Sequence, residues 1–189
     1  MTQPRIAVYL ASAFPQDPRY AQAVTDLGTA MARRQLTLVY GGSDEGTMKT
    51  LADAVLGNGG SAIGVFPRDL PRSYLRQGLT QTYLVNNLAE RKAKMLELAD
   101  AVIALPGSCG TWDEFFDALA LAKLNILYGG KARPMGLLNV CGFYDELIAF
   151  IRKSVTLGFT PAACADLIAS SDSPNDLLEL ILNRINAAQ

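Results

Sequence analysis

The sequence of 189 residues contains no histidine. This absence excludes Ser-His and Cys-His nucleophilic pairs and every histidine-ligated metal site, because each of them needs an imidazole ring. Any acid–base chemistry must therefore come from aspartate, glutamate, lysine, tyrosine or cysteine side chains.

Cysteine is scarce as well. Cys109, Cys141 and Cys164 are odd in number and form no Cys-x-x-Cys spacing. A disulfide framework needs pairs and a zinc site needs clustered ligands, so we interpret the three residues as free thiols in a reducing compartment. The sequence predicts neither a metal site nor a bound cofactor.

The chain has no excess of either charge and no long apolar run. Seventeen basic and eighteen acidic residues give a formal net charge of −1, which predicts binding to neither nucleic acid nor a membrane. The apolar run at residues 6–11 is short for a signal peptide, and residues 5–11 suit a first β-strand better. No run approaches the length of a membrane span, so we expect a cytoplasmic protein.

Half of the residues are hydrophobic and 19% are charged, a composition typical of one globular core. Strand-like runs alternate with stretches of helical period along the whole chain. Strands are expected at residues 5–11, 36–40, 61–66, 81–85, 100–105, 134–140 and 166–170. Helices are expected at residues 18–34, 46–57, 87–98, 111–124, 143–157 and 174–187.

This alternation predicts a single Rossmann-like, doubly wound α/β domain over residues 1–189. Its parallel sheet has about seven strands flanked by helices on both faces. In the common strand order 3-2-1-4-5, the first, fourth and fifth strands are neighbours, and ligands bind beyond their carboxyl ends. We therefore expect residues 11–12, 86–91 and 106–114 to converge at one edge of the sheet.

The stretch LPGSCGTWDEF at residues 105–115 runs from a strand through a glycine loop into a helix. Gly107 and Gly110 permit a sharp turn, and the amides at the start of the helix suit a phosphate. Thr111-x-x-Glu114 also matches a capping box, with Thr111 as the N-cap. The alternative is a tight turn with nothing bound.

A second strand–glycine–helix junction, VYGGSDEGTMK, occupies residues 39–49. It matches neither G-x-G-x-x-G nor a P-loop, so it predicts at most a backbone cradle for part of a small nucleotide. In ERKAKMLELAD (90–100), Arg91 falls in the first helical turn, near the same edge as Glu114. We interpret Lys94 as a solvated residue paired with Glu90.

Together, Arg91-Lys92, ADAVIALPG, G-T-x-x-E and PMGLLNVCGFYDEL resemble the LOG (Lonely Guy) family of cytokinin riboside 5′-monophosphate phosphoribohydrolases. The resemblance covers about residues 6–159 and implies Arg91 and Glu114 as the catalytic pair. It implies a small-molecule nucleotide as substrate, no metal or cofactor, and a homodimer. Substrate contacts are expected from Ser12, Gly41, Gly42, Gly46, Leu88, Lys92, Pro106, Gly107, Ser108, Cys109, Gly110 and Thr111.

Four departures from the family pattern leave the base preference open. Ser108 replaces the second glycine of Pro-Gly-Gly, and Ser43 replaces the third glycine of Gly-Gly-Gly. Asn86-Asn87 and Leu88-Ala89 stand where the family has acidic residues and Met-His. We expect hydrolysis of AMP or N6-modified AMP to free base and ribose 5-phosphate. The alternative is a noncatalytic nucleotide or molybdenum-cofactor carrier on the same fold.

The expected homodimer would use apolar surface beside the site, on the helices predicted at 87–98 and 111–124 and on the segment 121–130. A two-fold pair is the commonest soluble assembly. The alternative is that Leu121, Leu124 and Ile126 belong to the core of one chain.

Overall fold

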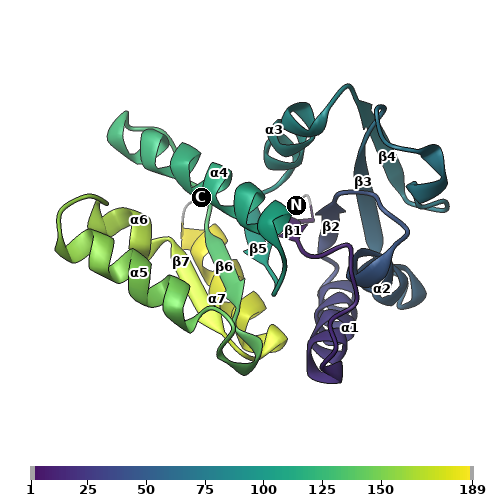
Figure 1. Cartoon of the computed structure of the whole chain (residues 1–189), viewed down its shortest axis with the longest axis horizontal. Coiled ribbons are helices and arrows are strands. Elements are labelled where there is room, and N and C mark those ends of the chain that lie inside the picture. Colours follow the sequence, from purple (N-terminus) through teal and green to yellow (C-terminus); the bar gives the residue numbers. More distant parts are fainter. Residues whose placement is uncertain (1–2, 188–189) are drawn as a thin grey trace.

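The computed structural model describes residues 3–187, and one sheet of parallel strands runs through its centre (Figure 1). The strands are β1 (Arg5–Tyr9), β2 (Thr37–Tyr40), β3 (Ser61–Pro67), β4 (Gln81–Val85), β5 (Ala101–Ala104), β6 (Met135–Leu138) and β7 (Ile168–Ser171). Their order in the sheet is β4-β3-β2-β1-β5-β6-β7, and every pairing is parallel. The predicted seven-stranded, doubly wound α/β fold is confirmed.

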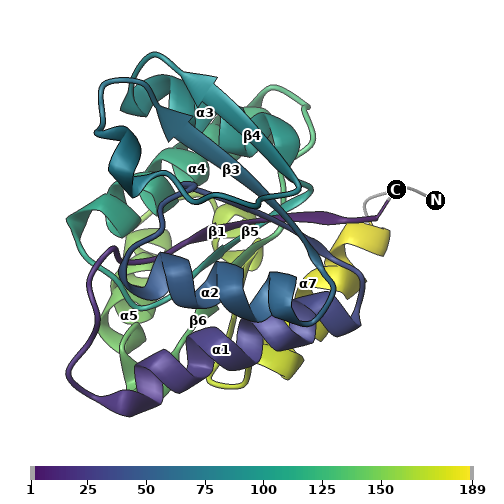
Figure 2. The same ribbon diagram turned by 90° about the vertical axis from the view of Figure 1, so that its right-hand side faces the viewer.

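Helices cover both faces of this sheet. They are α1 (Pro18–Arg33), α2 (Gly46–Gly57), α3 (Leu88–Leu98), α4 (Cys109–Leu127), α5 (Asp145–Thr156), α6 (Ala162–Asp166) and α7 (Pro174–Ala187), with short 3-10 turns η1 (Arg72–Tyr74) and η2 (Val140–Gly142). Helices α1, α2 and α7 lie together on one face (Figure 2). Helices α3 and α4 pack on the opposite face with the start of α5.

Strand β1 shows why the strands are apolar throughout. Ile6 and Val8 pack in the core beneath α1 and α7, whereas Ala7 and Tyr9 pack in the core beneath α3 and α4. Successive side chains of a strand point to opposite faces, so a sheet covered on both sides needs apolar residues at every position. No helix within residues 3–187 is long and apolar enough to cross a membrane.

The predicted neighbourhood of β4 and β1 is wrong. Strand β4 pairs with β3 at the edge of the sheet, because residues 68–80 join the two strands with only the short turn η1 between them. The chain then returns through α3, which packs across β3, β2 and β1 before β5 pairs with β1. The point at which the strand order reverses along the sheet therefore lies between β1 and β5.

Element ends differ from the predictions in a few places. Helices α2 and α7 have the expected bounds, but α4 begins at Cys109, two residues earlier than expected. Helix α6 was not predicted, since five residues are too few to show a helical period. The strand expected at 134–140 is shorter in the structure: β6 covers Met135–Leu138, and η2 begins at Val140.

Candidate active site

A cavity of about 360 Å³ opens beyond the carboxyl ends of the strands, at the switch between β1 and β5. In doubly wound sheets this is the place where ligands bind. Its lining comes from the ends of β1 and β3, the loops after β1, β2, β3 and β5, and helices α2, α3 and α4. The lining residues are Val8, Leu10, Ser12, Gly41, Ser43, Glu45, Met48, Phe66, Leu70, Tyr74, Arg91, Met95, Ser108, Gly110, Thr111 and Glu114.

Arg91 and Glu114 meet in the wall of this cavity. The Arg91 guanidinium donates from Nη2 to Oε1 of Glu114 over 2.6 Å, and the Glu114 side chain is only 9% exposed. Burial raises the pKa of the Glu114 carboxyl, and the charge and hydrogen bond of Arg91 oppose this rise without cancelling it. A buried carboxyl paired with one cation in a cavity is typical of a functional site.

The crossing of α3 over the sheet produces this pair. Arg91 lies in the first turn of α3 and Glu114 is the sixth residue of α4. On the solvent side of the same two helices, Lys92 Nζ lies 2.9 Å from Asp113 and 3.7 Å from Asp117. Adjacent residues of α3 thus pair with different carboxylates of α4: Arg91 with the buried Glu114, and Lys92 with the exposed Asp113 and Asp117.

The capping-box interpretation of Thr111 and Glu114 is wrong. The N-cap of α4 is Ser108, whose side chain makes no capping hydrogen bond. Thr111 is the third helical residue, and the Glu114 carboxylate is bonded to Arg91 instead of to a backbone amide. The helix begins earlier because Cys109 and Gly110 already have helical conformation.

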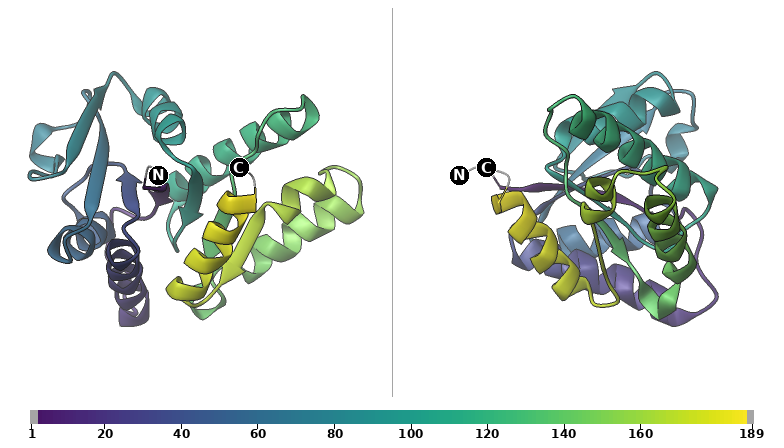
Figure 3. Two further views of the ribbon diagram at one scale, coloured as in Figure 1. Left: turned by 180° about the vertical axis from the view of Figure 1, so that it is seen from behind. Right: turned by 90° about the vertical axis from the view of Figure 1, so that its left-hand side faces the viewer.

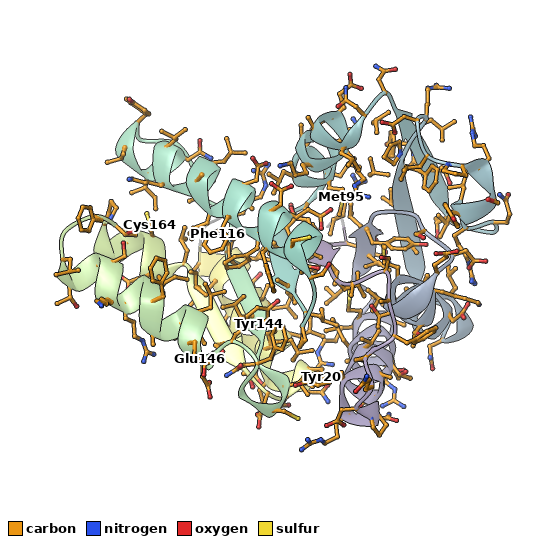
Figure 4. All side chains as sticks on the ribbon, in the orientation of Figure 1. Tyr20, Met95, Phe116, Tyr144, Glu146 and Cys164 are labelled. Atoms are coloured by element: carbon orange, nitrogen blue, oxygen red, sulfur yellow. The ribbon has the colours of Figure 1, made fainter. Side chains whose placement is uncertain are left out.

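The loop before α4 depends on Gly107. A Cβ atom added to Gly107 would stand 2.2 Å from the Thr111 hydroxyl oxygen, so the loop folds back tightly on the first turn. The Tyr144 hydroxyl donates to the carbonyl of Leu105 over 2.5 Å and holds the end of β5 (Tyr144 is labelled in Figure 4). The first amides of α4, which have no intrahelical partners, are fixed at the cavity.

The loop after β2 approaches both Arg91 and the loop after β1. A Cβ on Gly41 would stand 3.3 Å from Nη1 of Arg91. Gly46 has φ +52°, and its Cβ would stand 2.0 Å from the Ser12 carbonyl oxygen. The Thr47 hydroxyl donates to the carbonyl of Ala11 over 2.5 Å. These contacts bring Ser12 and Gly41 to one rim of the cavity.

Two polar atoms in this wall have no partner of their own. The Arg91 Nε and the Thr111 hydroxyl are buried and make no hydrogen bond with any residue between 3 and 187. Buried donors in folded proteins almost always have an acceptor. Their place beside the cavity suits a ligand with several oxygen atoms.

Of the residues predicted to bind substrate, five line the cavity beside the Arg91–Glu114 pair: Ser12, Gly41, Ser108, Gly110 and Thr111. Pro106 and Gly107 instead line a neighbouring cavity of about 230 Å³, which Ser108 also borders. The remaining predicted residues lie outside the cavity of the single chain: Gly42, Gly46, Leu88, Lys92 and Cys109.

Asn86, Asn87 and Leu88 stand at the start of α3 and do not reach the cavity. The Asn87 side chain accepts from the amide of Glu90, and the Glu90 carboxylate accepts from the Asn86 amide. The predicted pair of Glu90 with Lys94 is wrong, since Lys94 bonds Glu97. These asparagines begin the helix that carries Arg91.

The apolar wall of the cavity was not predicted from the sequence; it is formed by Met48, Phe66, Leu70 and Tyr74. Phe66 could have been predicted as a cavity residue, because it stands at the carboxyl end of the strand predicted at 61–66. Leu70 and Tyr74 carry no such signal, since they follow no helical or strand period. Within residues 3–187, no three Cys, Asp or Glu side chains gather closely enough to hold a metal ion.

We expect Gly107→Ala to lower the free energy of unfolding by about 1–3 kcal/mol, because the new Cβ overlaps Thr111. Gly110→Ala is the matched control: its Cβ would meet nothing within 4 Å, and alanine favours a helix. Urea unfolding of both variants measures the difference. Equal stability of the two variants would show that the loop does not fold back on Thr111.

The fold and site define a doubly wound α/β protein with a ligand cavity at the topological switch point. A model of the family described as "Possible lysine decarboxylase" matches residues 48–181. The chain is 38% identical over 175 residues to the probable cytokinin riboside 5′-monophosphate phosphoribohydrolase LOGL5 of Oryza sativa subsp. japonica, covering 92% of this chain and 70% of that protein.

The chain is also 35% identical over 178 residues to the cytokinin riboside 5′-monophosphate phosphoribohydrolase LOG2 of Arabidopsis thaliana, covering 94% of this chain and 82% of that protein. The chain belongs to this LOG family.

Solved structures of more distant proteins share the fold. The molybdenum cofactor binding protein of Rippkaea orientalis superimposes with a TM-score of 0.74 at 22% identity, over 98% of this chain and 99% of that one. The molybdenum cofactor carrier protein of Chlamydomonas reinhardtii gives 0.70 at 18% identity, over 98% and 99%. At these identities the similarity concerns the fold alone.

Proposed function

We propose that the protein hydrolyses the N-glycosidic bond of a nucleoside 5′-monophosphate, AMP or an N6-substituted AMP, to the free base and ribose 5-phosphate. The observation that carries this proposal is the buried Arg91–Glu114 pair in the wall of a cavity beside the first turn of α4. The names of the LOG relatives support the same reaction.

Glu114 performs the central step in this scheme. As the N-glycosidic bond breaks, its electron pair leaves with the base, and positive charge grows at C1′ of the ribose. The Glu114 carboxylate stabilises this charge and takes a proton from the water whose oxygen joins C1′. Arg91 holds that carboxylate in position through the 2.6 Å hydrogen bond. The base gains one proton as it leaves, which balances the reaction.

The first turn of α4 binds the 5′-phosphate in this scheme. Gly110 and Thr111 of this turn line the cavity opposite Ser12, and the free amides and positive end of a helix N-terminus favour an anion. The unpartnered Thr111 hydroxyl supplies a further donor. A bound phosphate fixes the distance between the ribose and Glu114.

Incubation of the purified protein with AMP, followed by chromatography, tests the proposal. Free adenine and ribose 5-phosphate in equal amounts are the expected products. A noncatalytic carrier on the same fold is the alternative that this assay tests. If the protein binds both AMP and N6-substituted AMP and releases the free base from neither, the carrier is favoured.

We also propose a homodimer that forms through α4. The second half of α4 projects away from the sheet (Figure 3), and Leu121 and Leu124 are 45% and 47% exposed, so neither belongs to the core of one chain. Exposed apolar patches of this kind mark association surfaces.

We also propose that the protein is cytoplasmic. The free thiols of Cys109 and Cys141 at the surface support this location.

Light scattering at micromolar concentration is expected to give twice the mass of one 20.3 kDa chain. Leu124→Glu is expected to give the monomer mass, because it places a charge in the proposed interface. Leu180→Glu is the matched control, since Leu180 is 42% exposed on α7, beneath the opposite face of the sheet. A monomeric wild-type protein would contradict the proposal.

A further inference from the structure

Residues 68–80, which we name the strap, connect β3 to β4 and contribute a wall of the cavity. Leu70 and Tyr74 line the cavity from the strap, next to Phe66 at the end of β3. This side of the cavity is apolar and aromatic, whereas the α4 side offers amides and hydroxyls. A planar base suits the first surface and a phosphate suits the second.

Backbone hydrogen bonds fasten the strap to the loop after β2. The Asp44 amide donates to the Tyr74 carbonyl over 2.8 Å, and the Arg76 amide donates to the Gly42 carbonyl over 2.9 Å. Ser43 and Leu75 form an isolated antiparallel bridge between these two bonds. The wall that bears Tyr74 is thus attached directly to the loop after β2 (residues 41–45), which we name the glycine loop.

Arg76 reinforces this attachment with its side chain. Its Nη1 lies 2.6 Å from Asp44 in the glycine loop, and its Nη2 lies 2.5 Å from Asp53 in α2. The Arg76 side chain is only 17% exposed. A guanidinium presents its donors in a rigid fork, so one residue fixes two carboxylates in set directions. Arg76 therefore joins the strap, the glycine loop and α2.

We propose that Arg76 is a positioning residue that holds the strap against the glycine loop, so that Leu70 and Tyr74 form a fixed wall for the base of the substrate. This inference rests on the proposed function, because the base is part of the proposed substrate. Arg76 does not line the cavity. It acts on substrate binding through the wall, while Arg91 and Glu114 come from α3 and α4.

The test compares Arg76→Met with Arg72→Met. Both substitutions remove one positive charge from the strap, but Arg72 is exposed and makes no side-chain hydrogen bond or ion pair within residues 3–187. In Arg76→Met we expect KM for AMP to rise roughly tenfold and kcat to change less than about threefold. Arg72→Met should match the wild type. Arg76→Lys should recover only part of the affinity, since an ammonium cannot serve both carboxylates as a fork.

Two further readouts separate positioning from general damage. Ribose 5-phosphate lacks the base, so its inhibition constant should be unchanged in Arg76→Met. Hydrogen exchange at the amides of residues 44 and 76 should become faster in this variant than in the wild type, because the strap is released. Asp53→Asn provides a milder release of the same anchor if Arg76→Met folds poorly, with the same expected direction in KM and exchange.

Unchanged exchange at Asp44 and Arg76 would show that Arg76 does not hold the strap. Faster exchange with an unchanged KM for AMP would show that the strap does not form the base wall. If the wild type cleaves no nucleotide, the proposed function fails by itself. Calorimetric titration with AMP then replaces KM: weaker binding by Arg76→Met alone supports the positioning role, and equal binding by all variants overturns it.

Discussion

Replacing Glu114 with glutamine is expected to lower kcat for AMP cleavage by at least about a hundredfold, the scale of typical acid–base and electrostatic contributions. The substitution keeps the size of the side chain and an oxygen that accepts from Arg91. It removes the negative charge that stabilises C1′ and the group that takes a proton from water. A steady-state assay of adenine release measures the loss.

Asp113→Asn is the matched control for this variant. Asp113 is the preceding residue of α4, but its side chain is 65% exposed and paired with Lys92 outside the cavity. Its activity should stay within a few-fold of the wild type, and thermal unfolding should show both variants folded. Activity of Glu114→Gln close to that of Asp113→Asn would show that Glu114 is a structural residue.

The pH dependence should report the same carboxyl group. Burial raises the pKa of Glu114, with Arg91 opposing the rise, and the proposed role requires the ionised form. The ratio kcat/KM should therefore fall as the pH drops through this raised pKa, at a higher pH than an exposed glutamate would give. A profile that stays flat down to the pKa of an exposed glutamate would contradict the burial of the reacting carboxyl.

The layers of the fold were predictable because a covered parallel sheet constrains nearly every strand residue. Ile6 and Ala7 are apolar on opposite faces, and this pattern repeats in each central strand. The position of β4 was not predictable in the same way. The link at 68–80 has neither a helix nor a regular period, so nothing local decides whether the next strand extends the sheet or returns to its centre.

The meeting of Arg91 with Glu114 was predicted, although the expected place of β4 was wrong. It holds because α3 crosses from the edge of the sheet back to β5, which brings its first turn over Gly41 and toward α4. The α4 side of the cavity was predictable from the sequence, because a glycine loop that leads into a helix N-terminus is a recognisable pattern. Leu70 and Tyr74 could not be predicted as cavity residues, because only the tertiary contacts of the strap place them in the cavity wall.

A local sequence pattern gave a wrong prediction where two different structures fit the same spacing. Thr111-x-x-Glu114 satisfies the capping-box rule, yet the carboxylate is bonded to Arg91. Asn87 and Glu90 follow the same spacing at α3, and there the Asn87 side chain does cap the helix. The difference is burial: Glu90 is exposed beside its own backbone, whereas Glu114 faces a guanidinium in the cavity.

The 5′-phosphate should control catalysis as well as affinity. We expect kcat/KM for adenosine to be roughly a thousandfold or more below that for AMP, through a lower kcat together with a higher KM. The amides of the first turn of α4 need an anion with several oxygen atoms, and Glu114 lies further along the same helix. Without the phosphate, nothing fixes the distance between C1′ and the Glu114 carboxylate.

A side-by-side assay of AMP, adenosine and ATP, each with and without EDTA, tests this anchoring. ATP should be a poor substrate, because its additional phosphates must fit into the part of the cavity between Ser12 and Thr111, where we propose that a single phosphate binds. EDTA should leave the rates unchanged, since the proposed chemistry uses only Glu114, Arg91 and water. Added ribose 5-phosphate should compete with AMP, because it carries the anchored group. Equal turnover of adenosine and AMP would refute the phosphate anchor, since the α4 amides would then contribute nothing to the alignment of the ribose with Glu114.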